Sequence, residues 1–104
     1  MIVLVPGHKY EIPNDEDRTS GQILQFVHRE ALTPDSSYPP STLSDGCTEG
    51  DVLAVLLNKL QYRHSKSSSK ELACAITKLE EAQMWLEKRE RLELAKYAKQ
   101  TEGN

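Results

Sequence analysis

The chain has 104 residues, of which 38% are hydrophobic and 28% are charged, and its formal net charge at pH 7 is −3. This length predicts one small domain, whose modest core favours oligomerisation. The acidic balance argues against nonspecific binding to duplex nucleic acid, which needs an excess of basic charge.

The chain begins with an apolar stretch, "MIVLV", that ends at Pro6. This stretch is far shorter than a secretory signal or a membrane-spanning helix, so we expect neither signal nor membrane segment. The two cysteines, Cys47 and Cys74, make no disulfide framework. Without a secretory signal, we expect both to be free thiols in a reducing compartment.

Residues 2–29 predict a small antiparallel β-sheet. The segments "IVLV" and "KYEI" flank Pro6 and Gly7, which suit the two central positions of a type II turn. Pro13 interrupts the second strand, and "QILQFVHR" gives a third strand with alternating side chains. Residues 30–47 are rich in proline and serine, and we expect no regular structure there.

Residues 48–98 predict a helical hairpin, and residues 99–104 form a tail. Two capping boxes mark the starts of the helices, Thr48 with Asp51 and Ser68 with Glu71. The short turn "SKSSS" between the helices predicts that they run antiparallel. The predicted fold class is therefore α+β, a small N-terminal antiparallel sheet followed by a long antiparallel helical hairpin.

The apolar residues of the two helices do not match one another. The second helix has a narrow stripe at steps of three and four residues, Leu72, Ile76, Leu79, Ala82 or Gln83, and Leu86. The first has a broader arc, Val52, Leu53, Val55, Leu56, Leu57 and Leu60. The second helix is also longer, roughly 42 Å against roughly 25 Å, which leaves Leu92, Leu94 and Tyr97 without a partner in the chain. Both features predict a dimer or larger homo-oligomer formed through the helices.

Groups suited to catalysis or metal binding do not converge in the sequence. His8, His28 and His64 fall on a turn, a strand and a helix end, without metal-ligand spacing. Glu80 and Glu81 are adjacent in a helix and point to different sides. The glycines form no phosphate-binding loop. We expect a protein that is not an enzyme, with no catalytic residues, no metal and no cofactor.

Aromatic and basic side chains gather at helical spacing in both helices. On the first helix they are Lys59, Tyr62, Arg63 and Lys66, and on the second Trp85, Arg89 and Lys96. A ring beside an arginine suits a nucleotide-like ligand, because the ring stacks on a base and the guanidinium holds a phosphate. The alternative is that Tyr62 and Trp85 are peripheral core residues with long charged neighbours.

Four segments, "PGHKYEI", "GQILQFV", "DGCTEGDVLAVLLNKLQY" and "AITKLEEAQMWLEKR", make the chain resemble the phage Thoeris anti-defence proteins that act as signal sponges. The resemblance implies a non-enzymatic binder of cyclic ADP-ribose isomers made by bacterial TIR-domain enzymes. Some members also bind cyclic oligonucleotides, a role related to that of anti-CBASS sponges. The resemblance also implies a homo-oligomer in the cytoplasm of the infected bacterial host, with no duplex nucleic acid and no membrane as partner.

The resemblance assigns roles to three residues of this chain. The base-stacking aromatic of the family falls on Tyr62, its phosphate-binding arginine on Arg89, and a basic residue of the first helix on Lys59. We interpret Trp85 as a packing residue in the helix bundle or at a subunit interface.

Two positions depart from the family pattern. Leu72 stands where the family has an asparagine, and Glu93 stands where a second arginine is expected. Because a carboxylate at this position would repel a phosphate, Arg91, Arg63 or Lys96 is an alternative phosphate contact, or the ligand is another cyclic nucleotide.

Two other classes of function are consistent with parts of the sequence. A helical adaptor that docks a host protein would have no need for Tyr62, Lys59 and Arg89 to converge. A small hydrolase that degrades the signal would need catalytic groups, which the sequence does not offer.

Overall fold

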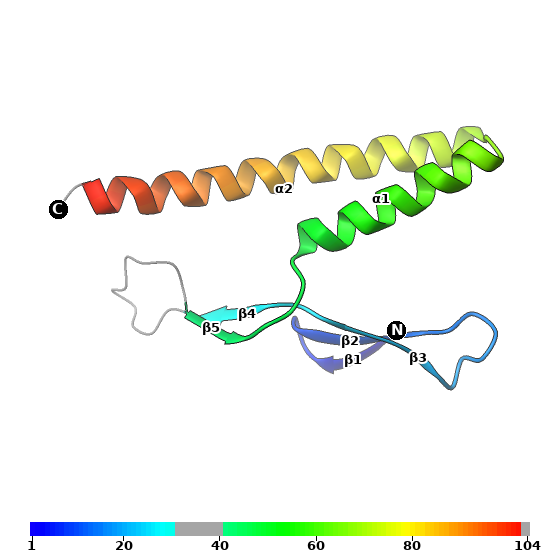
Figure 1. Ribbon diagram of the computed structural model, residues 1–104, viewed down its shortest axis with the longest axis horizontal. Coiled ribbons are helices and arrows are strands. Elements are labelled where there is room, and N and C mark those ends of the chain that lie inside the picture. The colour runs from blue at the N-terminus through cyan, green and yellow to red at the C-terminus, as the bar shows by residue number, and fades with distance from the viewer. Residues whose placement is uncertain (31–40, 103–104) are drawn as a thin grey trace. The chain divides into compact units, whose positions relative to one another are not determined.

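The computed structural model describes residues 1–30 and 41–102 (Figure 1). The chain divides into two compact units, Met1–Thr48 and Glu49–Asn104. The described part of the first unit is built from strands and that of the second from helices. This arrangement confirms the predicted α+β class.

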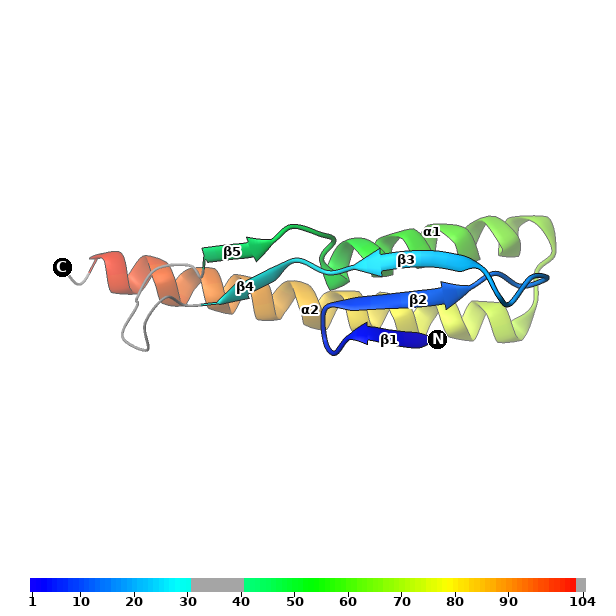
Figure 2. The ribbon, with the colours of Figure 1, turned by 90° about the horizontal axis from the view of Figure 1, so that it is seen from below.

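The first unit contains a three-stranded antiparallel sheet in the order β1-β2-β3 (Figure 2). Its strands are β1 (Ile2–Val5), β2 (Lys9–Pro13) and β3 (Gly21–Gln25). The turn between β1 and β2 has the predicted type II form. Gly7 has a φ of 79°, and the His8 N–H donates to the Val5 carbonyl at 2.9 Å.

The third strand ends earlier than the sequence predicts, because the chain changes partner after Gln25. The Val27 N–H donates to the Cys47 carbonyl, and the Cys47 N–H donates to the Gln25 carbonyl, both at 2.9 Å. Gly46 allows this close approach, since a Cβ there would lie 2.5 Å from the Gln25 carbonyl oxygen. Two short segments therefore form a separate antiparallel pair, β4 (His28–Glu30) and β5 (Ser41–Ser44).

The expectation that residues 30–47 lack regular structure was wrong for β5. The backbone of "STLS" pairs with β4 in the register Glu30↔Ser41 and Arg29↔Thr42. The serine-rich composition does not predict a strand here, because pairing with β4 holds this segment extended and its own β-propensity is low. Residues 31–40 lie outside the described residues.

The second unit is an antiparallel helical hairpin of α1 (Glu49–Lys66) and α2 (Lys70–Glu102). α1 begins directly after Thr48, as predicted. The predicted cap of α2 is one residue too early: Ser69 Oγ, not Ser68 Oγ, accepts the N–H of Leu72, at 3.1 Å. Ser68 Oγ instead donates to the His64 carbonyl at 3.3 Å, which ties the turn to the end of α1.

The two helices meet along a narrow seam. Leu57 is the buried hydrophobic residue of the described chain, with 5% of its surface exposed. Other half-buried residues along the seam are Leu53, Leu60, Leu72, Ile76, Leu79 and Gln83. This confirms the predicted stripe of α2 as far as Gln83. Leu86 is 37% exposed, because α2 is longer than α1 (33 residues against 18) and continues past it.

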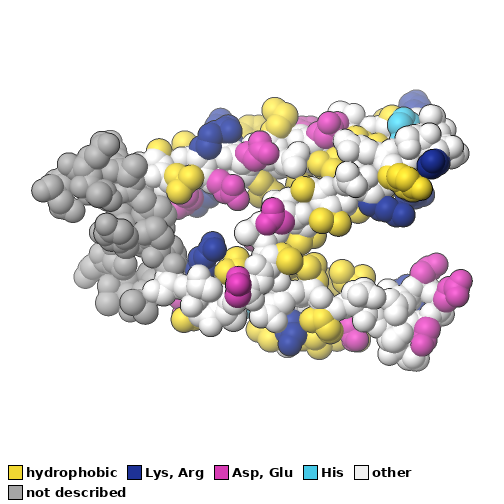
Figure 3. Space-filling view, viewed as in Figure 1, with side chains coloured by type: hydrophobic (Ala, Val, Ile, Leu, Met, Phe, Trp, Pro, Cys, Tyr) yellow, Lys and Arg dark blue, Asp and Glu magenta, His cyan; other side chains and the backbone are white. Residues whose placement is uncertain are grey.

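Large apolar side chains remain exposed on both helices, as Figure 3 shows for one face of the molecule. They include Val55, Leu56, Met84, Trp85, Leu92 and Leu94. Leu92 and Leu94 are exposed among the described residues, in line with the sequence prediction, and the side chain of Tyr97 lies outside the described part. Self-association through these residues stays a prediction. Over the described residues, neither helix is apolar and long enough to cross a membrane.

Candidate functional site

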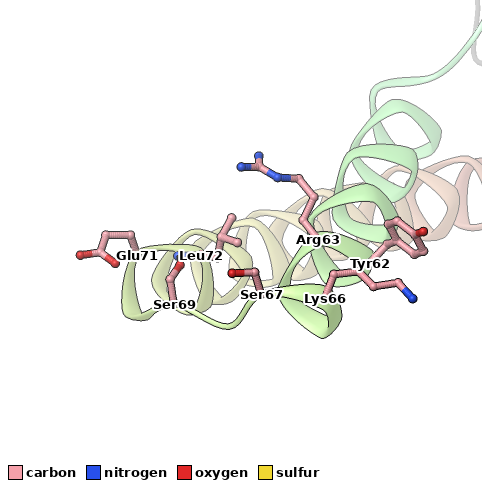
Figure 4. Close-up of a pocket in the computed structure, with 7 residues that line it drawn as sticks. All are labelled: Tyr62, Arg63, Lys66, Ser67, Ser69, Glu71 and Leu72. Carbon is pink, nitrogen blue, oxygen red and sulfur yellow. Dashed lines mark hydrogen bonds between the residues drawn. The ribbon is translucent and has the colours of Figure 1, made fainter.

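The tip of the hairpin, where α1 ends and α2 begins, holds an open hollow of about 580 Å³ (Figure 4). The residues that line it are Tyr62, Arg63, Lys66, Ser67, Ser69, Glu71 and Leu72. The short turn after Lys66 brings the last turn of α1 next to the first turn of α2. The hollow therefore follows directly from the hairpin geometry.

Tyr62 presents its ring at the surface between two ammonium groups. Lys59 Nζ lies 5.8 Å and Lys66 Nζ 5.5 Å from the ring centroid. The three residues share one side of α1 because they are spaced by three and four positions. Tyr62 is 58% exposed, so it does not belong to the hairpin core. The ring and both lysines are exposed, so a planar, anionic ligand can reach them, and stacking on the ring would displace an ammonium group from its face.

Arg63 belongs to the same hollow but points away from Tyr62 and Lys66 (Figure 4). Glu71 is the carboxylate that lines the hollow, in the first turn of α2. Among the described residues, no carboxylate forms an ion pair with Lys59, Arg63 or Lys66. The tip therefore carries uncompensated positive charge, which suits a phosphate-bearing ligand.

Arg89 lies elsewhere on α2. Its Nη2 is 2.6 Å from Oε1 of Glu93, one turn further along the helix. Arg89 is roughly 17 residues beyond Leu72, which corresponds to about 25 Å along a helix. A single chain therefore does not bring Arg89 to the tip hollow that contains Tyr62.

Arg91 lines a second hollow, of about 360 Å³, on the outer surface of α2. Met84, Trp85, Glu87 and Lys88 complete its lining. Lys88 Nζ lies 5.2 Å from the centroid of the Trp85 ring. Trp85 is 62% exposed, so it does not pack within the hairpin of its own chain. Its place at a subunit interface stays a prediction.

The five residues predicted to bind a ligand thus fall in three places. Lys59, Tyr62 and Arg63 lie together near the tip, whereas Arg89 and Arg91 occupy separate positions on α2. Ser67 and Ser69 line the hollow without having been predicted as site residues, although the turn "SKSSS" signals hydroxyl groups at the tip. Lys88 was not predicted either, and the signal for it is its position three residues after Trp85.

The first unit contains a histidine pair that the sequence did not reveal. The rings of His8 and His28 stack with centroids 3.7 Å apart, and His28 Nε2 lies 3.0 Å from Oε1 of Glu30. They are brought together when the chain passes from β3 to β4. The described residues contain no group of three potential ligands able to hold a metal ion.

The second unit is a helical hairpin domain whose tip combines an aromatic ring with cations. A family model described as the Acb2/Tad1 hairpin domain matches residues 37–89. This match covers half of the chain, which therefore belongs to the Acb2/Tad1 hairpin family. Family membership confirms the resemblance to phage Thoeris anti-defence proteins that the sequence motifs suggested.

One curated relative is Thoeris anti-defense 1 of Bacillus phage SBSphiJ7. It is 47% identical to this chain over 47 residues, which are 44% of this chain and 33% of the relative. The aligned part is therefore a third of the relative's length. No solved structure matches the chain.

Proposed function

We propose that this protein is a phage anti-defence protein that binds cyclic nucleotide immune signals and holds them without cleaving them. The ligands are cyclic ADP-ribose isomers or cyclic oligonucleotides, and capture keeps the signal from its effector in the cytoplasm of the infected host. Membership of the Acb2/Tad1 hairpin family and the name of the phage relative support this role.

The observation that carries the proposal is the ring of Tyr62 between the ammonium groups of Lys59 and Lys66. A base stacked on the ring would displace an ammonium group from its face and place its phosphates within reach of both lysines. Stacking on an aromatic ring is tolerant of base identity, and the cations add attraction for the phosphates. Arg63 and the hydroxyls of Ser67 and Ser69 add donors in the same hollow.

Self-association is part of the proposal. Tyr62 and Arg89 lie too far apart in one chain for a single cyclic nucleotide to contact both. A dimer or larger assembly through the exposed apolar residues of α1 and α2 would cover that surface and allow Arg89 of one copy to approach Tyr62 of another.

A thermal-shift panel of cyclic ADP-ribose isomers and cyclic di- and trinucleotides tests the binding. A ligand that binds only the folded state stabilises it by about 2.7 kcal/mol at a hundredfold excess over its Kd. We expect at least one cyclic ligand to raise the melting temperature, and the linear counterpart of the same nucleotide to raise it less. No shift with any cyclic ligand would contradict the proposal.

The alternative function is a helical adaptor that docks a protein and uses no small ligand. The exposed Met84 and Trp85 beside Lys88 favour it, because a ring and a thioether at the surface suit a protein contact. Replacing Tyr62 by Ala separates the two functions. A signal sponge would lose affinity for its cyclic ligand, whereas an adaptor that docks a protein through Met84 and Trp85 would keep its partner.

A further inference from the structure

The basic groups of this hairpin are not equally available to a ligand. Arg89 is already engaged by a carboxylate of its own helix, with Nη2 2.6 Å from Oε1 of Glu93. Within the described residues, the cations at the tip, Lys59, Arg63 and Lys66, form no ion pair. An anion therefore meets open cations at the tip and an occupied guanidinium at Arg89.

The ion pair is of a kind that exchanges readily. The side chain of Arg89 is 71% exposed and that of Glu93 is 32% exposed, so water screens the attraction. The carboxylate also follows the cation by four residues, which is the less favourable order in a helix. A phosphate can displace Glu93, because the ion pair uses one carboxylate oxygen and one nitrogen of the guanidinium, whereas a phosphate can accept from two N–H donors of the fork.

We propose that Glu93 is a specificity-determining residue for anion binding at Arg89. In the free chain Glu93 pairs with the guanidinium of Arg89, so a ligand group competes with a carboxylate, and a phosphate held by two N–H donors competes best. A weaker acceptor, such as a ribose hydroxyl or a base carbonyl, leaves the ion pair in place. This inference rests on the proposed function for the identity of the ligand, but the competition at Arg89 is a property of the chain itself.

The matched control is Glu90, the neighbour of Arg89 in the chain. Glu90→Gln and Glu93→Gln change the net charge equally on the same helix. Adjacent residues of a helix point about 100° apart, and the ion pair of Arg89 is formed with Glu93. Any difference between the two variants therefore reports the specific pair and not the overall charge.

The test uses the full chain labelled with ¹⁵N and titrated with inorganic pyrophosphate. The Arg89 Nε–H signal is assigned by its loss in Arg89→Lys, and far-UV circular dichroism verifies that every variant is helical. We expect the Arg89 signal of Glu93→Gln to respond at a pyrophosphate concentration about two- to fivefold lower than in the parent. Glu90→Gln should respond like the parent. Equal midpoints for the two variants, or an Arg89 signal that does not move in any protein, would overturn the inference.

The same variants titrated with the cyclic ligand from the thermal-shift panel connect the inference to the proposed function. Glu93→Gln should bind that ligand about two- to fivefold more tightly than Glu90→Gln. If no cyclic ligand binds the parent, the proposed function fails, while the pyrophosphate titration still decides the role of Glu93. If the cyclic ligand binds all three proteins with one affinity, Arg89 is not a ligand contact and the inference fails for that ligand.

Discussion

Replacing Tyr62 by Ala removes the ring that lies between Lys59 and Lys66 at the hairpin tip. The ring is 58% exposed and lies outside the helix seam, so the free energy of unfolding should change by only about 0.5 kcal/mol. The two ammonium groups, 5.8 Å and 5.5 Å from the ring centroid in the parent, remain in the variant, but their cation–π contacts with the ring are lost. The variant thus separates stacking from charge.

The expected loss is that of one stacking contact. A base stacked on an aromatic side chain contributes about 1–3 kcal/mol, which corresponds to a Kd about 5- to 150-fold higher. Tyr62→Phe keeps the ring and should stay close to the parent. Both Tyr62→Ala and Tyr62→Phe leave the charge of the tip unchanged, so any difference between them belongs to the ring.

Isothermal titration calorimetry with one cyclic nucleotide measures the effect. Tyr62→Phe is the matched control, since it keeps the ring and the charge of the tip. Parental affinity in Tyr62→Ala, or an equal loss of affinity in Tyr62→Phe and Tyr62→Ala, would show that the ligand does not stack on Tyr62.

Four further substitutions or measurements test the ligand contact at Arg89, the stability of the hairpin and the assembly of the chain. Arg89→Lys should lose much of the affinity for a cyclic nucleotide, because an ammonium cannot reproduce two parallel hydrogen bonds. Arg89→Glu should abolish binding of the same ligand. If calorimetry finds parental affinity for Arg89→Glu, Arg89 does not belong to the site. Ser69→Ala should lower the free energy of unfolding by about 0.5–2 kcal/mol in urea denaturation, and by more than Ser68→Ala, since Ser69 caps α2. Leu57→Ala should cost about 2–5 kcal/mol in the same assay, and a loss no larger than that of an exposed residue would contradict its place in the seam. Light scattering at micromolar concentration should report a dimer or larger species, and a monomer would leave the overhanging end of α2 without cover.

The parts of the fold that depend on local chemistry could be predicted from the sequence. Pro6 with Gly7 defines a type II turn, because only a residue that tolerates positive φ fits its third position. The stripe from Leu72 to Gln83 follows from helical periodicity, and the shortness of the turn makes the helices antiparallel. These features need no knowledge of distant residues.

The parts that depend on distant partners could not be predicted. β5 is a strand because β4 pairs with it, and the stacking of His8 on His28 arises from the passage between two sheets. The cap of α2 shifted from Ser68 to Ser69 because neighbouring serines compete for the same role and the turn selects one. Local sequence offers both serines equally.

Part of the geometry around the predicted site residues followed from the sequence, and part did not. Helical spacing placed Lys59 beside Tyr62, as the structure shows. The resemblance put Arg89 in one site with Tyr62, although Arg89 lies about 25 Å along α2 from Leu72 at the tip. Spacing did not show that Glu93 pairs with Arg89, since a flexible carboxylate at that position can equally face solvent.

The proposed function requires the protein to capture a cyclic nucleotide signal intact. Incubating the purified chain with a cyclic ADP-ribose isomer or cyclic oligonucleotide, removing unbound ligand, and denaturing the protein with heat releases whatever was held. Chromatography with mass detection then identifies the released molecule. We predict recovery of the unmodified cyclic ligand in stoichiometric proportion to the protein. Recovery of a cleaved product, or of no ligand from any member of the panel, would contradict the account.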